Sequence, residues 1–264
     1  ARASTRLARA RACATSPGSS PSSWRESRHE HVSESRDDED ARDGTVEVVM
    51  GPAVLEGADG AERFWLPENS GNGRYDAYAE IGYHSVATDL DGDGIGEIIA
   101  GSSVYRSDGS LLCNVEVDGS IGPDVDGFSA PFLPEENASP VYALVGNGML
   151  RIVGASCDVQ TSVKLAGSGN GGPPTIADFT GDGRPDVAVA NSDKVAVYTT
   201  DGELVWSEDI TDASSHALGL MAFDFEGDGR LELVYADELA LTIRDGRTGA
   251  LRFADASHTS RTAH

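Results

Sequence analysis

The sequence predicts an all-β protein: a β-propeller with blades of four antiparallel strands and a repeat of about 45 residues. Two observations lead to this prediction. Short apolar runs separated by Gly, Asp and Asn turns dominate the chain, and amphipathic stretches of helical length are scarce. A short acidic loop also occurs three times, and each copy runs directly into a β-prone stretch. The copies are DLDGDGIGE, DFTGDGRPD and DFEGDGRLE, which start at Asp89, Asp178 and Asp224.

Composition excludes some classes of function. The chain has 264 residues and a formal net charge of -24, from 44 acidic and 20 basic side chains. Such an acidic chain lacks the basic face that phosphate binding needs, so we expect no nucleic-acid partner. Its charge suits divalent cations instead. No apolar run approaches the roughly 18 residues of a membrane span, so the sequence predicts no such span.

The first part of the chain differs from the remainder. Residues 1–40 are rich in Arg, Ser and Ala and contain no apolar run like that of an intact signal peptide. We interpret them as a disordered leader, with a basic arm for nucleic acid or an anionic surface as the alternative. The propeller segment is predicted to cover 45–264.

The loop spacing predicts the blades in order. The loops start 89 and 46 residues apart, so the unit between the first two lacks its loop. In that unit we align 141–144 and 149–153 with the strand pair at 194–198 and 203–206. The predicted units cover 45–84 (an irregular unit), 85–128, 129–172 (a degenerate unit), 173–218 and 219–264.

The nine-residue pattern D-x-[DTE]-G-D-G-x-x-[DE], followed by a β run at this period, resembles the FG-GAP/VCBS repeat family. Such repeats build the β-propeller of integrin α subunits and of many secreted bacterial proteins. The resemblance covers 45–264, is strongest at 85–117 and 173–256, and implies an extracellular or cell-surface protein. The family usually has seven blades and this chain offers four to five, so we expect an incomplete propeller.

Oxygen ligands at alternate positions of each loop indicate calcium, a hard cation that takes about six to eight oxygens. Positions 1, 3, 5 and 9 offer side-chain oxygens, and position 7 offers a backbone carbonyl. Up to three Ca2+ ions are therefore predicted. Site 1 comprises Asp89, Asp91, Asp93, the Ile95 carbonyl and Glu97. Site 2 comprises Asp178, Thr180, Asp182, the Arg184 carbonyl and Asp186. Site 3 comprises Asp224, Glu226, Asp228, the Arg230 carbonyl and Glu232.

Two other interpretations of the loops are weaker. An EF-hand needs a Glu at position 12 and flanking helices, whereas position 12 here is Ala100, Val189 or Tyr235 and the flanks are β-prone. Plain Asp-Gly turns would not repeat the same acidic spacing three times. We expect calcium to have a structural role, and site 2 to bind most weakly, because Thr180 is uncharged.

Other motifs are interpreted as structural. The glycine-rich stretch 167–172 precedes a strand, so we predict a linker between blades and no dinucleotide site. His84, His216 and His258 are predicted to be scattered surface histidines, and Trp206 to pack within the blades. Cys113 and Cys157 are 44 residues apart, close to one period, so they would occupy similar positions on diverging outer strands. That placement argues against a disulfide.

These observations predict a calcium-binding extracellular scaffold that binds a protein or glycan and is not catalytic. The alternative is a propeller module of a secreted carbohydrate-active or other extracellular enzyme. An enzyme would need convergent carboxylates or a histidine cluster outside the metal loops, and the sequence shows no such pattern. The ligand cannot be named from the sequence, because fold alone does not determine function.

Overall fold

The computed structural model describes residues 46–66, 85–120, 126–136, 138–216 and 218–257. The chain divides into two compact units, Ala1–Asp37 and Asp38–His264, and every described residue belongs to the second. The predicted leader at 1–40 therefore lies outside the described residues. All regular elements in the described part are β-strands, and no helix there is long and apolar enough to cross a membrane.

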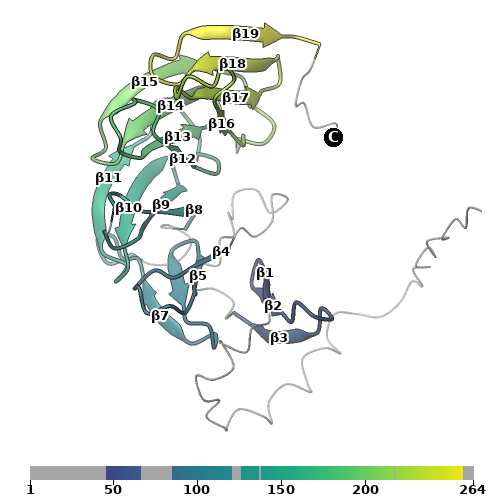
Figure 1. Ribbon diagram of the computed structural model, residues 1–264, viewed down its shortest axis with the longest axis vertical. Helices are drawn as coiled ribbons and strands as arrows, with labels where there is room; N and C mark the ends of the chain where they lie inside the picture. Colours follow the sequence, from purple (N-terminus) through teal and green to yellow (C-terminus); the bar gives the residue numbers. More distant parts are fainter. Residues whose placement is uncertain (1–45, 67–84, 121–125, 137, 217, 258–264) are drawn as a thin grey trace, which may run out of the picture. The chain divides into compact units, whose positions relative to one another are not determined.

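The described strands form antiparallel sheets that follow one another along the chain (Figure 1). Sheet 1 contains β1 (Val48–Met50), β2 (Ala53–Leu55) and β3 (Glu62–Trp65). Sheet 2 contains β4 (Val86–Thr88), β5 (Glu97–Ala100), β6 (Ser103–Tyr105) and β7 (Leu111–Asn114). Sheet 3 contains β8 (Phe128–Phe132), β9 (Val141–Gly146), β10 (Met149–Gly154) and β11 (Val159–Lys164). Sheet 4 contains β12 (Thr175–Ala177), β13 (Asp186–Ala190), β14 (Lys194–Thr199) and β15 (Leu204–Asp209). Sheet 5 contains β16 (Met221–Phe223), β17 (Glu232–Ala236), β18 (Leu241–Asp245) and β19 (Leu251–Asp255).

These sheets confirm the predicted all-β class and the four-stranded unit, but the prediction for the third unit was wrong in register. We aligned its two clearest strands with β14 and β15, the third and fourth strands of sheet 4. In the structure β9 and β10 are the second and third strands of sheet 3, with β8 before them and β11 after them. The tight Asn147–Gly148 turn between them misled the alignment, because it resembles the glycine turns before the fourth strands. No acidic loop precedes β9 to mark the true start.

Apolar cores lie between neighbouring sheets. Between sheets 4 and 5, the buried side chains include Val197 and Trp206 on one side and Leu233 and Tyr235 on the other. Similar clusters join sheets 1 and 2, sheets 2 and 3, and sheets 3 and 4. Successive side chains of a strand point to opposite faces, so sheets 2, 3 and 4 each use one face for the preceding neighbour and the other for the following one. These short strands therefore depend on both neighbours for their burial.

A recurring contact, which we call the interblade joint, connects each sheet to the next. One partner lies on the outermost strand of a sheet, at the pair next to a β-bulge. The other partner lies in the following sheet, in the turn between its last two strands, and has a positive φ. A Cβ added to Gly109, Gly202 or Gly249 would lie 2.7 to 2.9 Å from the partner side chain. At these three positions glycine is favoured, because a Cβ would clash with the partner side chain and the positive φ would strain any other residue. The four joints are Phe64–Gly109, Cys113–Cys157, Thr161–Gly202 and Trp206–Gly249.

The second joint corrects our prediction for the cysteines. Cys113 and Cys157 form a disulfide, with their Cα atoms 5.9 Å apart. They do not occupy equivalent positions: Cys113 lies on the outermost strand β7, whereas Cys157 lies in the turn between β10 and β11 and has a φ of 61°. The residue of sheet 3 that is equivalent to Cys113 is Thr161, so Cys157, 44 residues after Cys113, falls in the turn before the outermost strand. Cys157 stands where three other joints have glycine, and its sulfur replaces packing contact with a covalent bond.

This geometry predicts that glycine can partly replace the disulfide. In the C113T/C157G variant, Thr and Gly occupy the joint as they do at Thr161–Gly202, so the positive φ at position 157 is free of strain. In C113T/C157S the disulfide is equally absent but the strain remains. We expect C113T/C157G to be more stable than C113T/C157S by about 1 kcal/mol. Urea unfolding followed by circular dichroism measures the difference, and equal midpoints for the two variants would contradict the joint.

Candidate metal centre

The predicted loops occupy equivalent places in sheets 2, 4 and 5. They connect β4 to β5, β12 to β13 and β16 to β17, which are in each case the first and second strands. Because neighbouring strands run in opposite directions, these loops lie at the same end of their sheets as the turns between the third and fourth strands. The acidic groups therefore lie at the same end of the sheets as the glycine turns of the joints.

The carboxylate at position 1 organises each loop. Asp89 accepts hydrogen bonds from the backbone N–H groups of Gly92 at 2.7 Å and Gly94 at 2.9 Å. Asp178 and Asp224 accept the corresponding bonds from the glycines of their own loops. The glycine at position 6 has a φ of 81° to 87° in all three loops, which a side chain would strain. The loop sequence thus folds the chain around the first carboxylate.

The acid at position 9 begins the second strand and is buried. Glu97, Asp186 and Glu232 are 4%, 1% and 2% exposed. Each accepts a backbone N–H from the start of its loop: Leu90 at 2.8 Å, Thr180 at 2.8 Å and Phe225 at 3.1 Å, respectively. One carboxylate oxygen of each acid therefore closes the loop.

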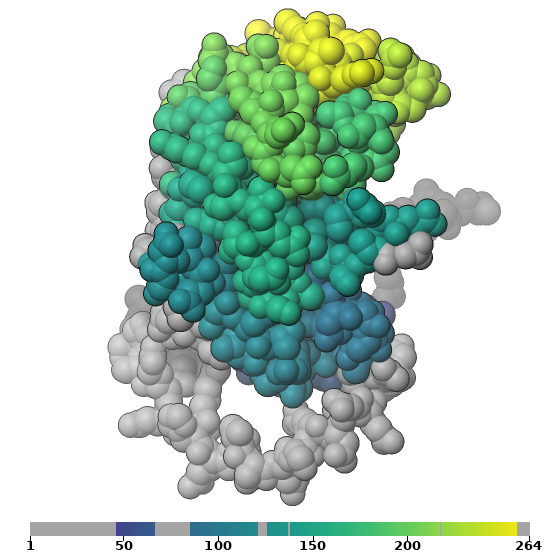
Figure 2. Space-filling model, turned by 90° about the vertical axis from the view of Figure 1, so that its left-hand side faces the viewer, coloured from purple at the N-terminus to yellow at the C-terminus, as the bar shows by residue number. Residues whose placement is uncertain are grey.

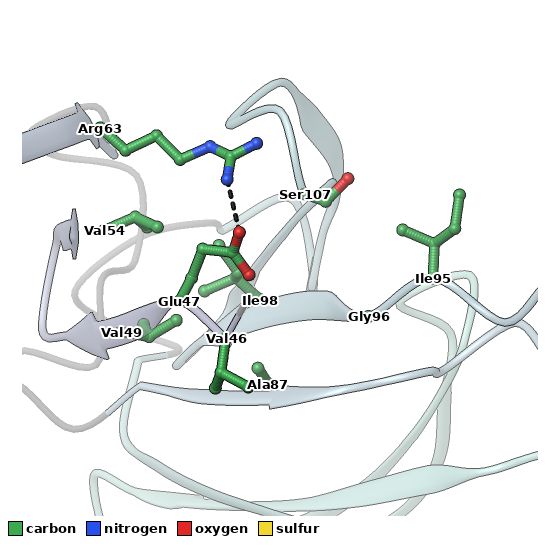
Figure 3. A pocket seen from close by; sticks show the side chains of 10 residues that line it. All are labelled: Val46, Glu47, Val49, Val54, Arg63, Ala87, Ile95, Gly96, Ile98 and Ser107. Atoms are coloured by element: carbon green, nitrogen blue, oxygen red, sulfur yellow. Dashed lines mark hydrogen bonds and ion pairs between the residues drawn. The ribbon is translucent and has the colours of Figure 1, made fainter. Parts of the chain in front are cut away.

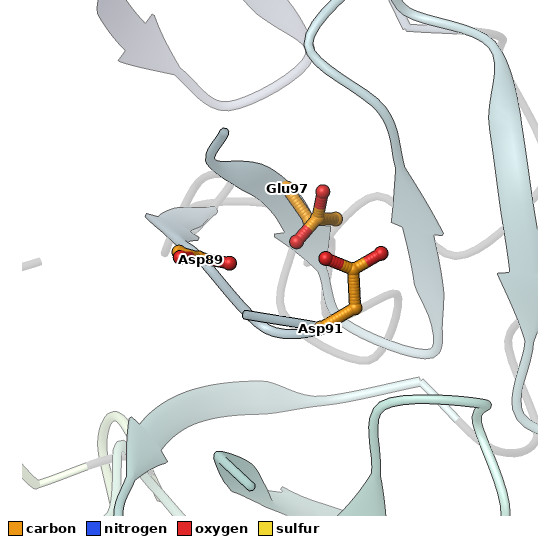
Figure 4. A group of neighbouring side chains, drawn as sticks. All are labelled: Asp89, Asp91 and Glu97. Atoms are coloured by element: carbon orange, nitrogen blue, oxygen red, sulfur yellow. The ribbon is translucent and has the colours of Figure 1, made fainter. Parts of the chain in front are cut away.

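Loops 1 and 3 bring three carboxylates together. In loop 1, oxygens of Asp89, Asp91 and Glu97 lie within 4.8 Å of one another, and Figure 4 shows the three side chains converging. Asp224, Glu226 and Glu232 form the same group in loop 3. Oxygens bound to one Ca2+ at about 2.4 Å lie no more than about 4.8 Å apart, so the three oxygens of each group are close enough together to contact one such ion.

The remaining predicted ligands are arranged differently. Asp93, Asp182 and Asp228 at position 5 accept the backbone N–H of position 7, from Ile95, Arg184 and Arg230 respectively. Asp93 and Asp228 are not part of the two carboxylate groups, and the role of the three position-7 carbonyls stays a prediction.

Loop 2 differs from the other two because its position 3 is uncharged. Thr180 has a buried hydroxyl oxygen that interacts with Asp186 but has no hydrogen-bond partner of good geometry. A buried oxygen without a partner is costly, and a cation would satisfy it.

Electrostatics at the loops also favours a cation. Burial raises the pKa of Glu97, and the nearby charges of Asp91 and Asp93 raise it further. Burial raises the pKa of Asp186 as well. By contrast, hydrogen bonds from the backbone, chiefly from Gly229, lower the pKa of the half-buried Asp224. Glu97 and Asp186 are thus harder to ionise without a positive partner, whereas the Asp224 carboxylate is favoured in its charged form.

Sheet 1 contains a related acid that sequence reasoning missed. The turn at 56–61 has the same hydrogen bonds as the turn at 245–250, and Gly57 and Gly246 pass under the carbonyls of Val46 and Leu231. Glu47 therefore corresponds to Glu232, the acid at position 9. The spacing of Gly57 and Gly60 before β3, repeated as Gly246 and Gly249 before β19, was the available signal.

An arginine supplies positive charge to this acid in two sheets. Arg63 forms a hydrogen-bonded ion pair with Glu47 beside a pocket of about 300 Å³ between sheets 1 and 2 (Figure 3). At the corresponding place in sheet 5, Arg252 lies 3.9 Å from Glu232. At the position of this arginine, sheet 2 has Leu112 and sheet 4 has Val205. Among the described residues, neither Glu97 nor Asp186 forms an ion pair. Among the described residues, the position-9 acids of loops 1 and 2 thus have no arginine paired with them.

Comparison with known proteins identifies the repeats. Residues 178–235 match the family of FG-GAP-like repeats, and this span runs from loop 2 to the end of β17. The resemblance predicted from the sequence is confirmed. A search of curated proteins finds no match.

Solved structures show the same fold. The V. cholerae biofilm matrix protein Bap1 is similar with a TM-score of 0.60 and 16% identity, over 82% of this chain and 60% of that one. BBS1N, solved in complex with ARL6DN, is similar with a TM-score of 0.52 and 14% identity, over 80% of this chain and 63% of that one. This chain therefore spans less than two thirds of each. The β-propeller class is confirmed.

The other residues singled out in the sequence make contacts within and between the sheets. The stretch 167–172 links β11 to β12, as predicted for a linker, and Ser168 donates to Asp193 at 2.7 Å. Trp206 packs in β15, and its indole N–H donates to the Gly246 carbonyl at 2.7 Å, which confirms its packing role. His216 contacts the Ser192 hydroxyl through Nδ1. His84 and His258 lie outside the described residues.

Removing one loop-1 acid should weaken one calcium site. In Asp91→Asn we expect the affinity of that site to fall about tenfold or more, because calcium affinity depends on the number of charged ligands. Calorimetric titration of chelator-treated protein measures this. Glu203→Gln is the matched control, since it removes one exposed acid from a turn outside the loops. An equal loss in both variants would show a net-charge effect without coordination.

Adding an acid to loop 2 should have the opposite effect. Thr180→Asp completes the acidic pattern of loops 1 and 3, so we expect about tenfold tighter calcium binding at this loop. The same substitution should lower stability in chelator, because it crowds a further carboxylate against Asp186. Thermal unfolding with calcium and with EGTA gives both values, and a variant that is indifferent to calcium would count against a site at loop 2.

Proposed function

We propose that this chain is a calcium-stabilised, extracellular β-propeller scaffold that binds a protein or glycan partner and does not catalyse a reaction. The observation that carries the proposal is the convergence of three carboxylates in loops 1 and 3, on a backbone scaffold repeated in loop 2. The residues that would hold calcium are those at positions 1, 3 and 9. The ion would neutralise the mutual repulsion of these carboxylates and stiffen the loops at this end of the sheets.

Three features support an extracellular location. The Cys113–Cys157 disulfide suits an oxidising environment, since disulfides are rare in reducing compartments. Calcium modules outside cells bind with Kd of about 10⁻⁴ to 10⁻³ M, a range that a short exposed loop can reach. The net charge of -24 is also compatible with solubility in a fluid rich in cations.

The surroundings of the serine–histidine contact between Ser192 and His216 favour the non-catalytic role. The Ser192 backbone N–H donates to the Ser168 carbonyl at 3.1 Å, and its carbonyl accepts from Asp212 at 2.9 Å. Ser192 therefore ties the connection before sheet 4 to the connection after it. Its contact with His216 belongs to this bracing of neighbouring sheets.

Binding to defined glycans tests the proposal. The chain would be immobilised and exposed to a panel of neutral and acidic polysaccharides and extracellular-matrix proteins, first with calcium and then with EGTA. We expect at least one partner to bind with calcium and to dissociate at least tenfold more readily in EGTA. Asp91→Asn should lower the binding, and Glu203→Gln should leave it unchanged.

The same samples distinguish the enzymatic alternative. Bound polysaccharides are analysed for new reducing ends and for unsaturated sugars after prolonged incubation. Release of such products would assign the chain to an enzyme and overturn the non-catalytic proposal. Binding that is the same in calcium and EGTA would remove the metal loops from the function.

A further inference from the structure

Arg151 is a buried arginine without a counter-charge. It is 5% exposed, and neither its Nε nor its Nη1 atom donates a hydrogen bond within the part of the chain that the structure describes. The buried side chains of two other arginines each form an ion pair with a glutamate: Arg63 with Glu47, and Arg244 with Glu208. A guanidinium stays charged at neutral pH, so burying it without an anion is costly. Arg151 therefore marks a place where the fold favours an anion.

A lysine lies beside Arg151 on the same face of sheet 3. Arg151 pairs with Ser162, and Met149 pairs with Lys164, so the two basic residues are diagonal neighbours on β10 and β11. Lys164 is exposed, and among the described residues it forms no ion pair. In a chain with a net charge of -24, these two side chains create a local site of positive charge.

The strand pairing also shows where Arg151 lies in the sheet. It shares a face with Val153 and, through its pairing, with Leu144, and both are buried between sheets 2 and 3. It is two residues from Met149, where β10 begins after the turn that joins the second and third strands. The acidic loops join first to second strands, so this turn lies at the opposite end of the sheets. Sheet 3 is part of the surface in Figure 2, coloured teal to green between sheets 2 and 4.

A pocket of about 290 Å³, which we call the glycine pocket, lies at this end of sheet 3. It is lined by the turn Asn147–Gly148, by Met149, Lys164 and Leu165, and by the stretch Gly167–Gly169. The two glycines that end this stretch have positive φ, and a Cβ on either would lie 2.2 Å from a side-chain oxygen in the turn between β13 and β14. Glycine is therefore favoured at both positions, and it leaves backbone in the pocket wall. The volume is at the small end of the range for ligand pockets, which suits one unit of a longer ligand.

We propose that the glycine pocket binds an oxyanion of an acidic polysaccharide, a carboxylate or a sulfate group. Lys164 contacts the oxyanion, and the charge of Arg151, one pairing row deeper, stabilises it. The inference rests on the proposed scaffold function and narrows the partner to glycans with negative charge. None of the residues that line the glycine pocket is aromatic, so the bases of a nucleic acid find no stacking surface there. The acidic loops are at the opposite end of the sheets, where their charge repels such a ligand least.

Binding of defined polysaccharides to the immobilised full chain, in calcium, tests the inference. Dextran sulfate and polygalacturonate carry sulfate and carboxylate groups respectively, and unmodified dextran is the neutral probe. We expect one of the acidic polymers to bind at least tenfold more tightly than dextran, and the tighter one identifies the oxyanion. Lys164→Ala and Arg151→Gln should each weaken this binding at least fivefold. Arg106→Gln is the matched control, because it removes an exposed arginine from the turn between β6 and β7, at the other end of the sheets.

Thermal unfolding separates a binding role of Arg151 from a structural one. Since Arg151 has no partner among the described residues, Arg151→Gln should melt no lower than the unmodified chain. Arg244→Gln removes the ion pair with Glu208 and a hydrogen bond to Tyr235, so it should melt lower. If Arg151→Gln melts as low as Arg244→Gln, the arginine is held by the fold itself and the inference fails.

Four binding results would also overturn the inference. They are no binding of either acidic polymer, equally tight binding of dextran, an equal loss in Arg106→Gln, and tighter binding of a single-stranded DNA oligonucleotide than of both acidic polymers. Each would leave the scaffold function in place if another glycan or matrix protein binds in calcium and dissociates in EGTA. The scaffold function itself fails when no partner shows that dependence on calcium, so the two failures are distinguishable.

Discussion

Each sheet of this protein has two apolar faces and too few residues to bury either one alone, and the rest of the structure depends on this constraint. Strands of three to six residues cannot form a separate core, so stability comes from the stacking of sheet on sheet. The apolar clusters accordingly lie between sheets. The interblade joint sets how closely they approach, because its turn residue must pass directly beneath a side chain of the preceding sheet.

The joint also explains why the residue on the outermost strand differs from sheet to sheet while its position over the next turn stays the same. Phe64, Cys113, Thr161 and Trp206 differ in size and chemistry, yet each lies at a β-bulge over a residue with positive φ. A bulge increases local twist and redirects one side chain, which aims it at the next sheet. Glycine allows close packing there, and the cysteine pair reaches the same arrangement with a covalent bond.

At the end of the sheets that carries the acidic loops, a second constraint comes from the charge of a buried carboxylate. A buried acid at the start of the second strand holds the loop backbone, as Glu97 does for Leu90. Its negative charge then needs compensation. Arg63 provides it beside Glu47, and Arg252 approaches Glu232, whereas loop 1 gathers carboxylates with no such arginine. A divalent cation and an arginine are thus two solutions to one electrostatic problem in the same fold.

The sequence by itself determined the fold class, the repeat and the acidic loops, because these depend on local patterns: alternating apolar residues, glycine at fixed turn positions, and acids two residues apart. It also placed Trp206 correctly within the blade. The disulfide, the register of the third unit and the pairing of Arg63 with Glu47 were decided only by tertiary structure. Each involves residues that are distant in sequence and that meet only when one sheet pairs its strands and packs on the next. A tight turn at Asn147–Gly148 looks the same in sequence whichever two strands it joins, so only the packed sheets could distinguish them.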